Sequence, residues 1–226
     1  ARTDKYFIKR FLDEQEMRVH IILDGSKSMK NEKKWTLAKQ LASSLGQLVL
    51  GRDDRLSFAL VSEEKTIPFR RKGAIYRKAF SSHVSKLSNP TSTQMFTSIS
   101  SQHIAKDCTV LFILTDGLEP IEEWEKMLRK MPKFSQDIRL LLIQSSEDIN
   151  PSFAGDLQLI DSETEQRLNV SVSPRIIAEY EKKRVQHFKE LDTLCRRYGI
   201  HTLRVETKDD ISHIFFHQMI RANWIN

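Results

Sequence analysis

The chain has 226 residues, of which 39% are hydrophobic and 29% are charged, and its formal net charge at pH 7 is +6. The length and composition are typical of one large α/β domain, and no run of about 18 apolar residues predicts a membrane-spanning helix. The two cysteines form no Cys-x-x-Cys pair, which excludes a zinc-finger arrangement and favours two reduced, half-buried thiols.

The chain begins with an irregular segment and continues with the most informative stretch of the sequence. Residues 1–17 are expected to form an arm that packs on the domain, and residues 18–226 are expected to form that domain. The apolar, β-branched residues 19 and 21–23 predict a strand buried on both faces, and leucines at three- and four-residue spacing predict a helix at about 34–50. Between them, Asp24, Ser26 and Ser28 follow the carboxyl end of the strand, where open α/β sheets bind ligands.

The Asp-x-Ser-x-Ser spacing offers one carboxylate and two hydroxyls at alternate positions. Their oxygens can turn toward one point, as a hard divalent cation such as Mg²⁺ requires. The alternative is that Asp24, Ser26 and Ser28 cap the following helix. The motif alone does not decide between these two roles, so the later strands are needed.

The middle of the chain continues the alternation of strands and helices. A strand is predicted at 56–61, an edge strand at 65–69 that is guarded by Pro68 and by basic residues 70–72, and a helix at 73–87. Residues 90–93 precede a helix expected to contain Met95, Phe96, Ile99 and Ile104. The next apolar run, at 110–114, predicts a buried strand that ends in Thr115 and Asp116, and a helix at 121–131 follows.

The last third of the chain predicts a strand at 138–143, a hairpin with strands at 157–160 and 167–172, and a long helix with Ser173 as N-cap and Pro174 at its first position. That helix carries apolar residues from Ile176 to Cys195 and ends at Gly199. A strand at 201–205 and a helix at 211–220 complete the chain. The alternation predicts an α/β fold of three layers, with a doubly wound, mainly parallel sheet, helices on both faces and a small hairpin insertion.

Three loops therefore offer oxygen ligands, and at this point the chain resembles a von Willebrand factor A domain with a metal-ion-dependent adhesion site. The resemblance implies that Asp24, Ser26, Ser28, Thr93 and Asp116 hold Mg²⁺, with Mn²⁺ able to substitute. Thr91 and Thr97 lie close to Thr93 in sequence, and the spacing to Asp116 and the following helix favours Thr93.

A narrower resemblance covers nearly the whole chain. Residues 1–3, 9–11, 14–18, 156–164 and 194–200 are similar to the bacterial domain-of-unknown-function family fifty-eight. Members of this family are von Willebrand A-like and are often paired with AAA+ ATPases of the MoxR type. This chain departs from the family in having Gly117 after Asp116, where an aromatic residue is more usual, which bears on the partner and leaves metal binding untouched.

The function expected from these observations is a non-enzymatic, metal-dependent protein-interaction module. It would act as an adaptor for a MoxR-type AAA+ ATPase in protein complex assembly or maturation, with an acidic residue of the partner completing the metal site. The alternative is a metal-dependent, phosphatase-like hydrolase with Asp24 as nucleophile. Such enzymes usually carry a second Asp where this chain has Ser26, and no Gly-x-Ser-x-Gly elbow or Walker motif occurs.

The surplus of positive charge is expected on solvated helical faces. Its functional interpretations are an acidic protein partner or, if an anchor precedes this chain, the anionic inner leaflet of a membrane. Nucleic acid is not expected, because no aromatic and basic recognition motif accompanies the charge. The expected location is the cytoplasm, either as a free protein or as the cytoplasmic portion of a membrane-anchored one.

Overall fold

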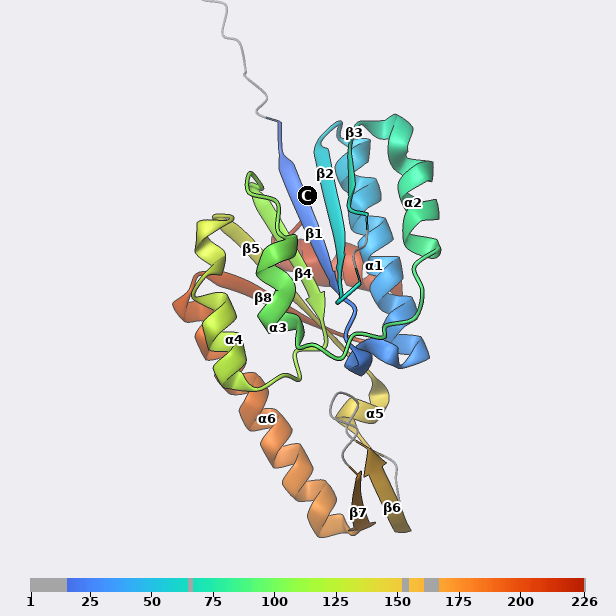
Figure 1. Cartoon of the computed structure of the whole chain (residues 1–226), viewed down its shortest axis with the longest axis vertical. Helices are drawn as coiled ribbons and strands as arrows, with labels where there is room; N and C mark the ends of the chain where they lie inside the picture. The colour runs from blue at the N-terminus through green and yellow to red at the C-terminus, as the bar shows by residue number, and fades with distance from the viewer. Residues whose placement is uncertain (1–15, 65–66, 152–154, 161–166, 226) are drawn as a thin grey trace, which may run out of the picture.

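One six-stranded sheet in the order β3-β2-β1-β4-β5-β8 forms the centre of the protein (Figure 1). The computed structural model describes residues 16–64, 67–151, 155–160 and 167–225. The sheet strands are β1 (Arg18–Asp24), β2 (Arg55–Val61), β3 (Phe69–Lys72), β4 (Val110–Thr115), β5 (Asp137–Gln144) and β8 (Ile200–Glu206). Only β3 among them runs antiparallel to its neighbour. Because the order winds outward from β1 in both directions, the predicted doubly wound, mainly parallel sheet is confirmed.

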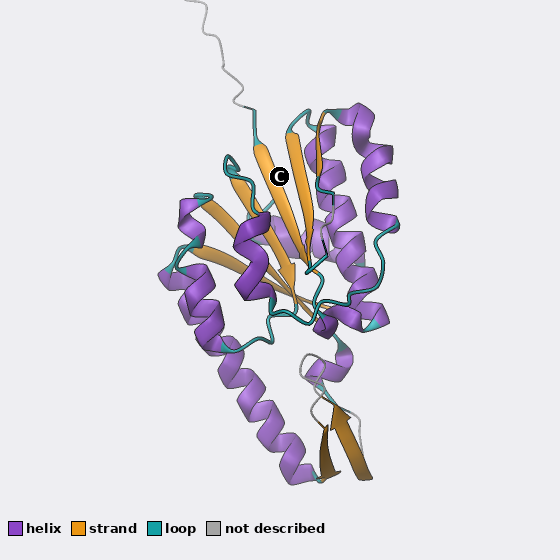
Figure 2. Ribbon diagram, viewed as in Figure 1, coloured by secondary structure: helices purple, strands orange, loops and turns teal. Residues whose placement is uncertain are grey.

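Helices cover both faces of this sheet, as Figure 2 shows. They are α1 (Glu32–Gly51), α2 (Arg77–Ser85), α3 (Phe96–Ile99), α4 (Ile121–Leu128), α5 (Ser146–Ile149), α6 (Pro174–Arg197) and α7 (Ile211–His213). Short 3₁₀ turns occur at Lys27–Lys30, Ala74–Tyr76, Ser100–His103 and Met131–Lys133, and α7 continues into a π-helical turn at Ile214–Met219. The antiparallel hairpin of β6 (Gly155–Ile160) and β7 (Arg167–Val172) lies outside the sheet and confirms the predicted insertion.

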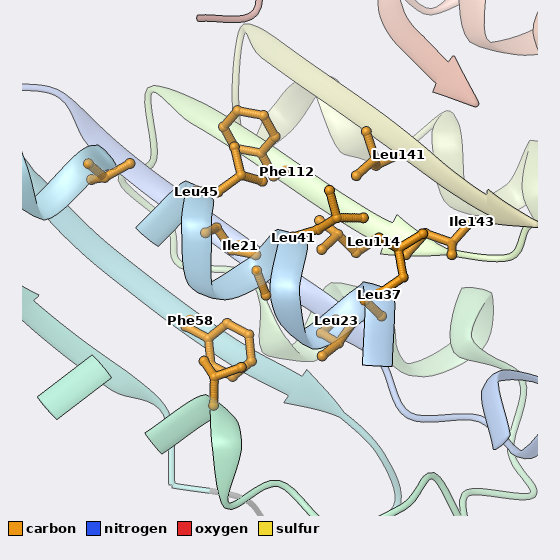
Figure 3. Packing of buried hydrophobic residues seen from close by; sticks show 14 of the residues in the cluster. Ile21, Leu23, Leu37, Leu41, Leu45, Phe58, Phe112, Leu114, Leu141 and Ile143 are labelled. Carbon is orange, nitrogen blue, oxygen red and sulfur yellow. The ribbon is translucent and has the colours of Figure 1, made fainter. Parts of the chain in front are cut away.

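Two hydrophobic cores lie on opposite faces of the sheet because successive residues of each strand point in opposite directions. On β1, Ile21 and Leu23 belong to the core under α1, whereas Ile22 belongs to the core that includes residues of α4 and α6. Figure 3 shows Leu41 of α1 among the strand residues of the first core. The central strands are buried on both faces, and this explains why their sequences are mostly apolar.

Two predicted boundaries were wrong at the edge of the sheet. The edge strand is at 69–72, so the basic residues expected to flank it form most of it, and Lys72 pairs with Arg55 of β2. Pro68 therefore precedes the strand, where its missing N–H costs no ladder hydrogen bond. The helix predicted from residue 73 begins as a 3₁₀ turn, and its Ile75 is exposed rather than packed.

Several helices are shorter or less buried than predicted. Met95 and Ile104 flank the helical residues 96–103 rather than lying within them, and α4 ends at Leu128, three residues early. On α6 the predicted apolar stripe is buried only in the second half of the helix. Phe188, Leu191, Leu194 and Cys195 are buried, whereas Ile176 and Tyr180 are exposed. The first half of α6 and the hairpin project beyond the sheet in Figure 1.

The predicted N-terminal arm falls mostly outside the described residues. Of its residues, Glu16 accepts a hydrogen bond from Arg55 of β2 and pairs with Lys72 of β3. The Met17 N–H donates to Asp54. Among the described residues, no helix combines the length and the apolar character needed to cross a bilayer.

Candidate metal-binding site

Asp24 lies at the carboxyl end of β1, and β4 runs parallel beside that strand. Since Leu23 pairs with Leu114, the polar residues that follow, Asp24 and Thr115, are brought together. The Asp24 carboxylate is buried and accepts hydrogen bonds from the Ser26 N–H at 2.8 Å and from the Thr115 hydroxyl at 2.7 Å. The parallel strand pair thus holds Asp24 in one orientation.

The Ser26 and Ser28 hydroxyl oxygens lie 2.9 Å apart, beside Asp24 in the same loop. Neither hydroxyl caps α1, because Asn31 does so by accepting hydrogen bonds from the N–H groups of Lys33 and Lys34. The capping role is therefore wrong for these serines. Neighbouring ligands of an octahedral Mg²⁺ ion with bonds of about 2.1 Å are separated by about 3.0 Å, so the spacing of the two hydroxyls fits such an ion.

The loop that carries Thr93 is joined to the Asp24 loop through backbone hydrogen bonds. The Lys27 N–H donates to Ser92 O at 2.9 Å, and the Ser92 N–H donates to Gly25 O at 3.1 Å. The Thr93 hydroxyl itself donates to the Glu63 carboxylate at 2.6 Å, and the Thr93 N–H donates to the same oxygen. The structure therefore brings the Thr93 loop to the site and directs its hydroxyl to Glu63.

The two other threonines considered for this position lie on either side of that loop. Thr97 is buried at the start of α3, and its N–H donates to Glu119 at 3.0 Å, whereas Thr91 is exposed. Glu119 also accepts from the N–H of Phe96, so its carboxylate closes the first turn of α3. This arrangement anchors the loop of residues 90–97 to the segment that follows Asp116.

Asp116 follows β4 and forms an ion pair with a residue that the sequence did not single out. Its Oδ2 atom lies 3.0 Å from Lys34 Nζ, and its Oδ1 atom accepts from the Leu118 N–H at 3.2 Å. The same Lys34 ammonium lies 3.0 Å from Asp148 Oδ2 and 3.2 Å from Ser28 O. The Lys34 contacts therefore connect Asp116 to the Ser28 end of the Asp24 loop.

The site holds more negative charge than its hydrogen bonds neutralise. Burial first, and the nearby Asp116 carboxylate second, raise the pKa of Asp24 to about 7, although hydrogen bonds from Thr115 and Ser26 lower it. Burial lowers the pKa of Lys34, but Asp116 and Asp148 together raise it above its ordinary value, so this side chain stays charged. Asp116 is paired with the Lys34 ammonium, whereas Asp24 accepts its hydrogen bonds from neutral groups, so a further cation beside these two buried carboxylates is favoured.

The donor set fits a small, hard cation. It consists of oxygen atoms, with the Ser26 and Ser28 hydroxyls at octahedral spacing and the Asp24 and Asp116 carboxylates nearby. In the described part of the chain, no three His, Cys, Asp or Glu side chains gather in a way that could hold a metal ion. The neutral hydroxyls would therefore have to be direct ligands, which suits Mg²⁺ better than a soft transition metal.

Sequence reasoning missed four residues that shape this site: Lys34, Glu63, Thr115 and Asp148. The sequence held a clue to Lys34 alone, because this lysine falls on the apolar stripe of α1 together with Leu37, Ala38 and Leu41. A lysine at a buried stripe position predicts a buried carboxylate partner. The other three lie at or shortly after the carboxyl ends of β2, β4 and β5, without a distinctive sequence pattern.

The chain matches a known protein family over most of its length. The sequence profile of the family described as "Protein of unknown function DUF58" matches residues 1–190. The chain belongs to this DUF58 family. The narrower resemblance predicted from the sequence is thereby confirmed, while no curated protein matches the chain in sequence.

Several solved structures are similar to this DUF58 chain over most of its length. BatB from Bacteroides thetaiotaomicron is 14% identical, with 92% of this chain and 98% of that chain covered and a TM-score of 0.43. An aerotolerance-related membrane protein from Bacteroides fragilis NCTC 9343 is 14% identical, with 92% and 100% covered and a TM-score of 0.44. The SpRpn10 VWA domain is 9% identical, with 90% and 95% covered and a TM-score of 0.48.

Proposed function

We propose that this DUF58 domain is a non-enzymatic, von Willebrand A-type interaction module that binds a partner protein through Mg²⁺. The ion would be held by Asp24, Ser26, Ser28 and Asp116, with Thr93 supplying a further oxygen. The observation that carries the proposal is the Ser26–Ser28 hydroxyl pair, 2.9 Å apart, beside the buried carboxylates of Asp24 and Asp116, of which Asp116 is paired with the Lys34 ammonium.

Each proposed ligand would have its own role in holding the ion. The Ser26 and Ser28 hydroxyls would touch the ion, and Asp24 and Asp116 would neutralise its charge directly or through water. Bound Mg²⁺ supplies a Lewis-acidic position, and mostly neutral protein ligands leave that position attractive to a carboxylate of the partner. Thr115 and the Ser26 N–H would keep the Asp24 carboxylate fixed while the partner binds and leaves.

The proposed partner, by resemblance, is a MoxR-type AAA+ ATPase, with this domain as adaptor between the ATPase and its substrate in complex assembly. Four residues flank the proposed ligands in sequence and are the candidates to contact this partner: Lys27, Met29, Met95 and Leu118. Leu118 is 40% exposed and remains suited to this role, but Met29 is fully buried and is excluded from it. Met29 packs in the core under α1 because the 3₁₀ turn after Ser26 directs it inward.

The hydrolase alternative fits the structure less well. An aspartate nucleophile needs a free carboxylate oxygen that faces the substrate, whereas Asp24 is 1% exposed and both of its oxygens accept hydrogen bonds. We therefore expect no turnover of phosphoesters or carboxylic esters by the purified domain. Activity that is lost in Asp24→Asn would instead favour the phosphatase-like role.

Calorimetric titration with Mg²⁺ and with Mn²⁺ tests the metal site. We expect one site per chain, lost in Asp24→Ala and in the double variant Ser26→Ala/Ser28→Ala. Ser85→Ala is a matched control, because the Ser85 hydroxyl only closes the end of α2 by donating to Ser82 O. Equal binding by the control and the site variants would refute the assignment.

A pull-down with a MoxR-type ATPase tests the partner. Complex formation should need divalent cation and should be lost with EDTA and in Asp116→Asn, which keeps the size of the side chain. Circular dichroism should show that Asp116→Asn remains folded. A complex that tolerates both EDTA and the variant would show that the ATPase binds elsewhere on this domain.

A further inference from the structure

Lys34 is a buried ammonium group at the start of the helix that covers the sheet. Its side chain is 3% exposed, although an apolar residue would suit this position of the α1 stripe. Burying an unpaired ammonium is costly, so a lysine here requires compensating charge. Asp116 and Asp148 provide that charge, each at 3.0 Å from Nζ.

The two carboxylates that hold Lys34 belong to different parts of the protein. Asp116 is a candidate metal ligand after β4, whereas Asp148 lies on α5 and has a separate task, because its Oδ2 atom accepts the Ser145 N–H in a capping box. The third partner is the backbone oxygen of Ser28, at 3.2 Å. The ammonium thus bridges the candidate site and a carboxylate outside it.

We propose that Lys34 is the resident counter-ion of the site and sets its affinity for divalent cations by competing for Asp116. This inference rests on the proposed role of Asp116 as a metal ligand. A divalent ion that binds the Asp116 carboxylate is repelled by the Lys34 ammonium, which already lies 3.0 Å from that carboxylate. Both cations cannot be fully compensated by one buried carboxylate.

Asp148 can keep the Lys34 ammonium paired when Asp116 binds the metal. When Asp116 turns to the metal, the Lys34 ammonium keeps its contacts with Asp148 and with Ser28 O, so it need not enter solvent. Because coupling free energies are reciprocal, a metal that weakens the Lys34–Asp116 ion pair has its own binding affinity lowered by that pair to the same degree. The opposite role is that Lys34 orients Asp116 for the metal, and that role predicts the reverse effect on affinity.

Calorimetric titration of Mg²⁺ into the wild type and three variants separates these roles. Lys34→Met keeps the length of the buried stem and removes the charge, and we expect its Mg²⁺ dissociation constant to fall at least tenfold. Asp148→Asn keeps an oxygen that can accept the Ser145 N–H and removes the negative charge, so Asp116 becomes the only one of the two partners that is a carboxylate and Mg²⁺ binding should weaken severalfold. Lys33→Met removes the same charge from an exposed neighbouring position and should stay within twofold of the wild type.

Thermal unfolding gives a second readout that does not need a measurable heat of binding. Without metal, Lys34→Met should unfold at a lower temperature than the wild type, because it leaves buried carboxylates uncompensated. Added Mg²⁺ should raise its unfolding temperature more than it raises that of the wild type. If Lys34→Met does not fold, Lys34→Gln takes its place, since its amide can still donate to Asp116.

The outcomes separate this inference from the proposed function. Tighter binding in Lys34→Met than in the wild type supports both. Equal or weaker binding in Lys34→Met refutes the counter-ion role and leaves the metal site in place. Binding in Lys34→Met alone supports the counter-ion role and shows that the native chain does not use the metal, whereas no binding in either protein refutes both.

Discussion

Acidification should destabilise this protein through His20, a buried side chain on β1. His20 is 2% exposed, and its Nδ1 atom accepts a hydrogen bond from the Ala105 N–H at 2.7 Å. That nitrogen must therefore stay unprotonated in the folded protein. Burial, with smaller effects of the positive charges of Arg70 and His103, lowers the pKa of His20 to about 4.

The size of the effect follows from the difference between the folded and unfolded pKa values. The unfolded chain takes up the His20 proton near pH 6.5, whereas the folded protein does so only near pH 4, so between these values the unfolded state binds more protons. The contribution of His20 is complete above pH 6.5 and is lost as the pH falls. This linkage amounts to about 2 kcal/mol at pH 5 and about 3 kcal/mol below pH 4.

Urea unfolding of the wild type and of His20→Asn at several pH values measures this contribution. Asn keeps an acceptor for the Ala105 N–H and does not titrate, so the difference between the two proteins isolates His20. The subtraction is needed because Asp24, whose pKa is raised to about 7, acts with the opposite sign and stabilises the folded state as the pH falls. A difference in unfolding free energy that stays constant from pH 7.5 to pH 5 would refute the reasoning.

Two further predictions concern packing. Gly117→Ala should destabilise the fold by at least about 1 kcal/mol more than Gly199→Ala, as measured by urea unfolding. Both glycines have positive φ, so the backbone strain is similar. A Cβ atom at Gly117 would lie 2.5 Å from Leu142 Cδ2, whereas a Cβ atom at Gly199 would meet no atom within 4 Å. Equal losses would mean that backbone conformation alone sets the cost. The free thiols Cys108 and Cys195 should resist alkylation in the native protein and react in urea, because burial raises the pKa of both, that of Cys195 to about 12. Rapid native labelling of Cys195 would contradict this.

The fold could be predicted from the sequence because its central strands are buried on both faces. Mostly apolar runs such as 19–23 and 110–114 have few alternatives, and the helices between them require parallel pairing. The edges were harder to predict, since an edge strand such as β3 carries charged residues that resemble a loop. On α6 the apolar spacing continued past the point where the sheet ends, so periodicity alone could not show which half is buried.

The candidate site was predictable only where it follows a strand end. Asp24 and Asp116 could be placed near one another because β1 and β4 are central apolar strands. The Glu63 carboxylate that binds Thr93, and the Lys34 ammonium that binds Asp116, come from distant parts of the chain. Their pairing depends on side-chain directions that only the folded structure determines.

The projecting half of α6 changes what a partner of this domain would encounter. The helix has 24 residues, about 36 Å of length, and extends beyond the carboxyl-terminal edge of the sheet, where the central strands β1 and β4 end (Figure 1). Two hydrogen bonds tie it to that edge, from the Tyr180 hydroxyl to Asp148 O at 2.8 Å and from His187 Nε2 to Gly117 O at 2.7 Å. A protein bound at that edge would meet α6 at a high effective concentration, so two weak contacts could together give a firm association.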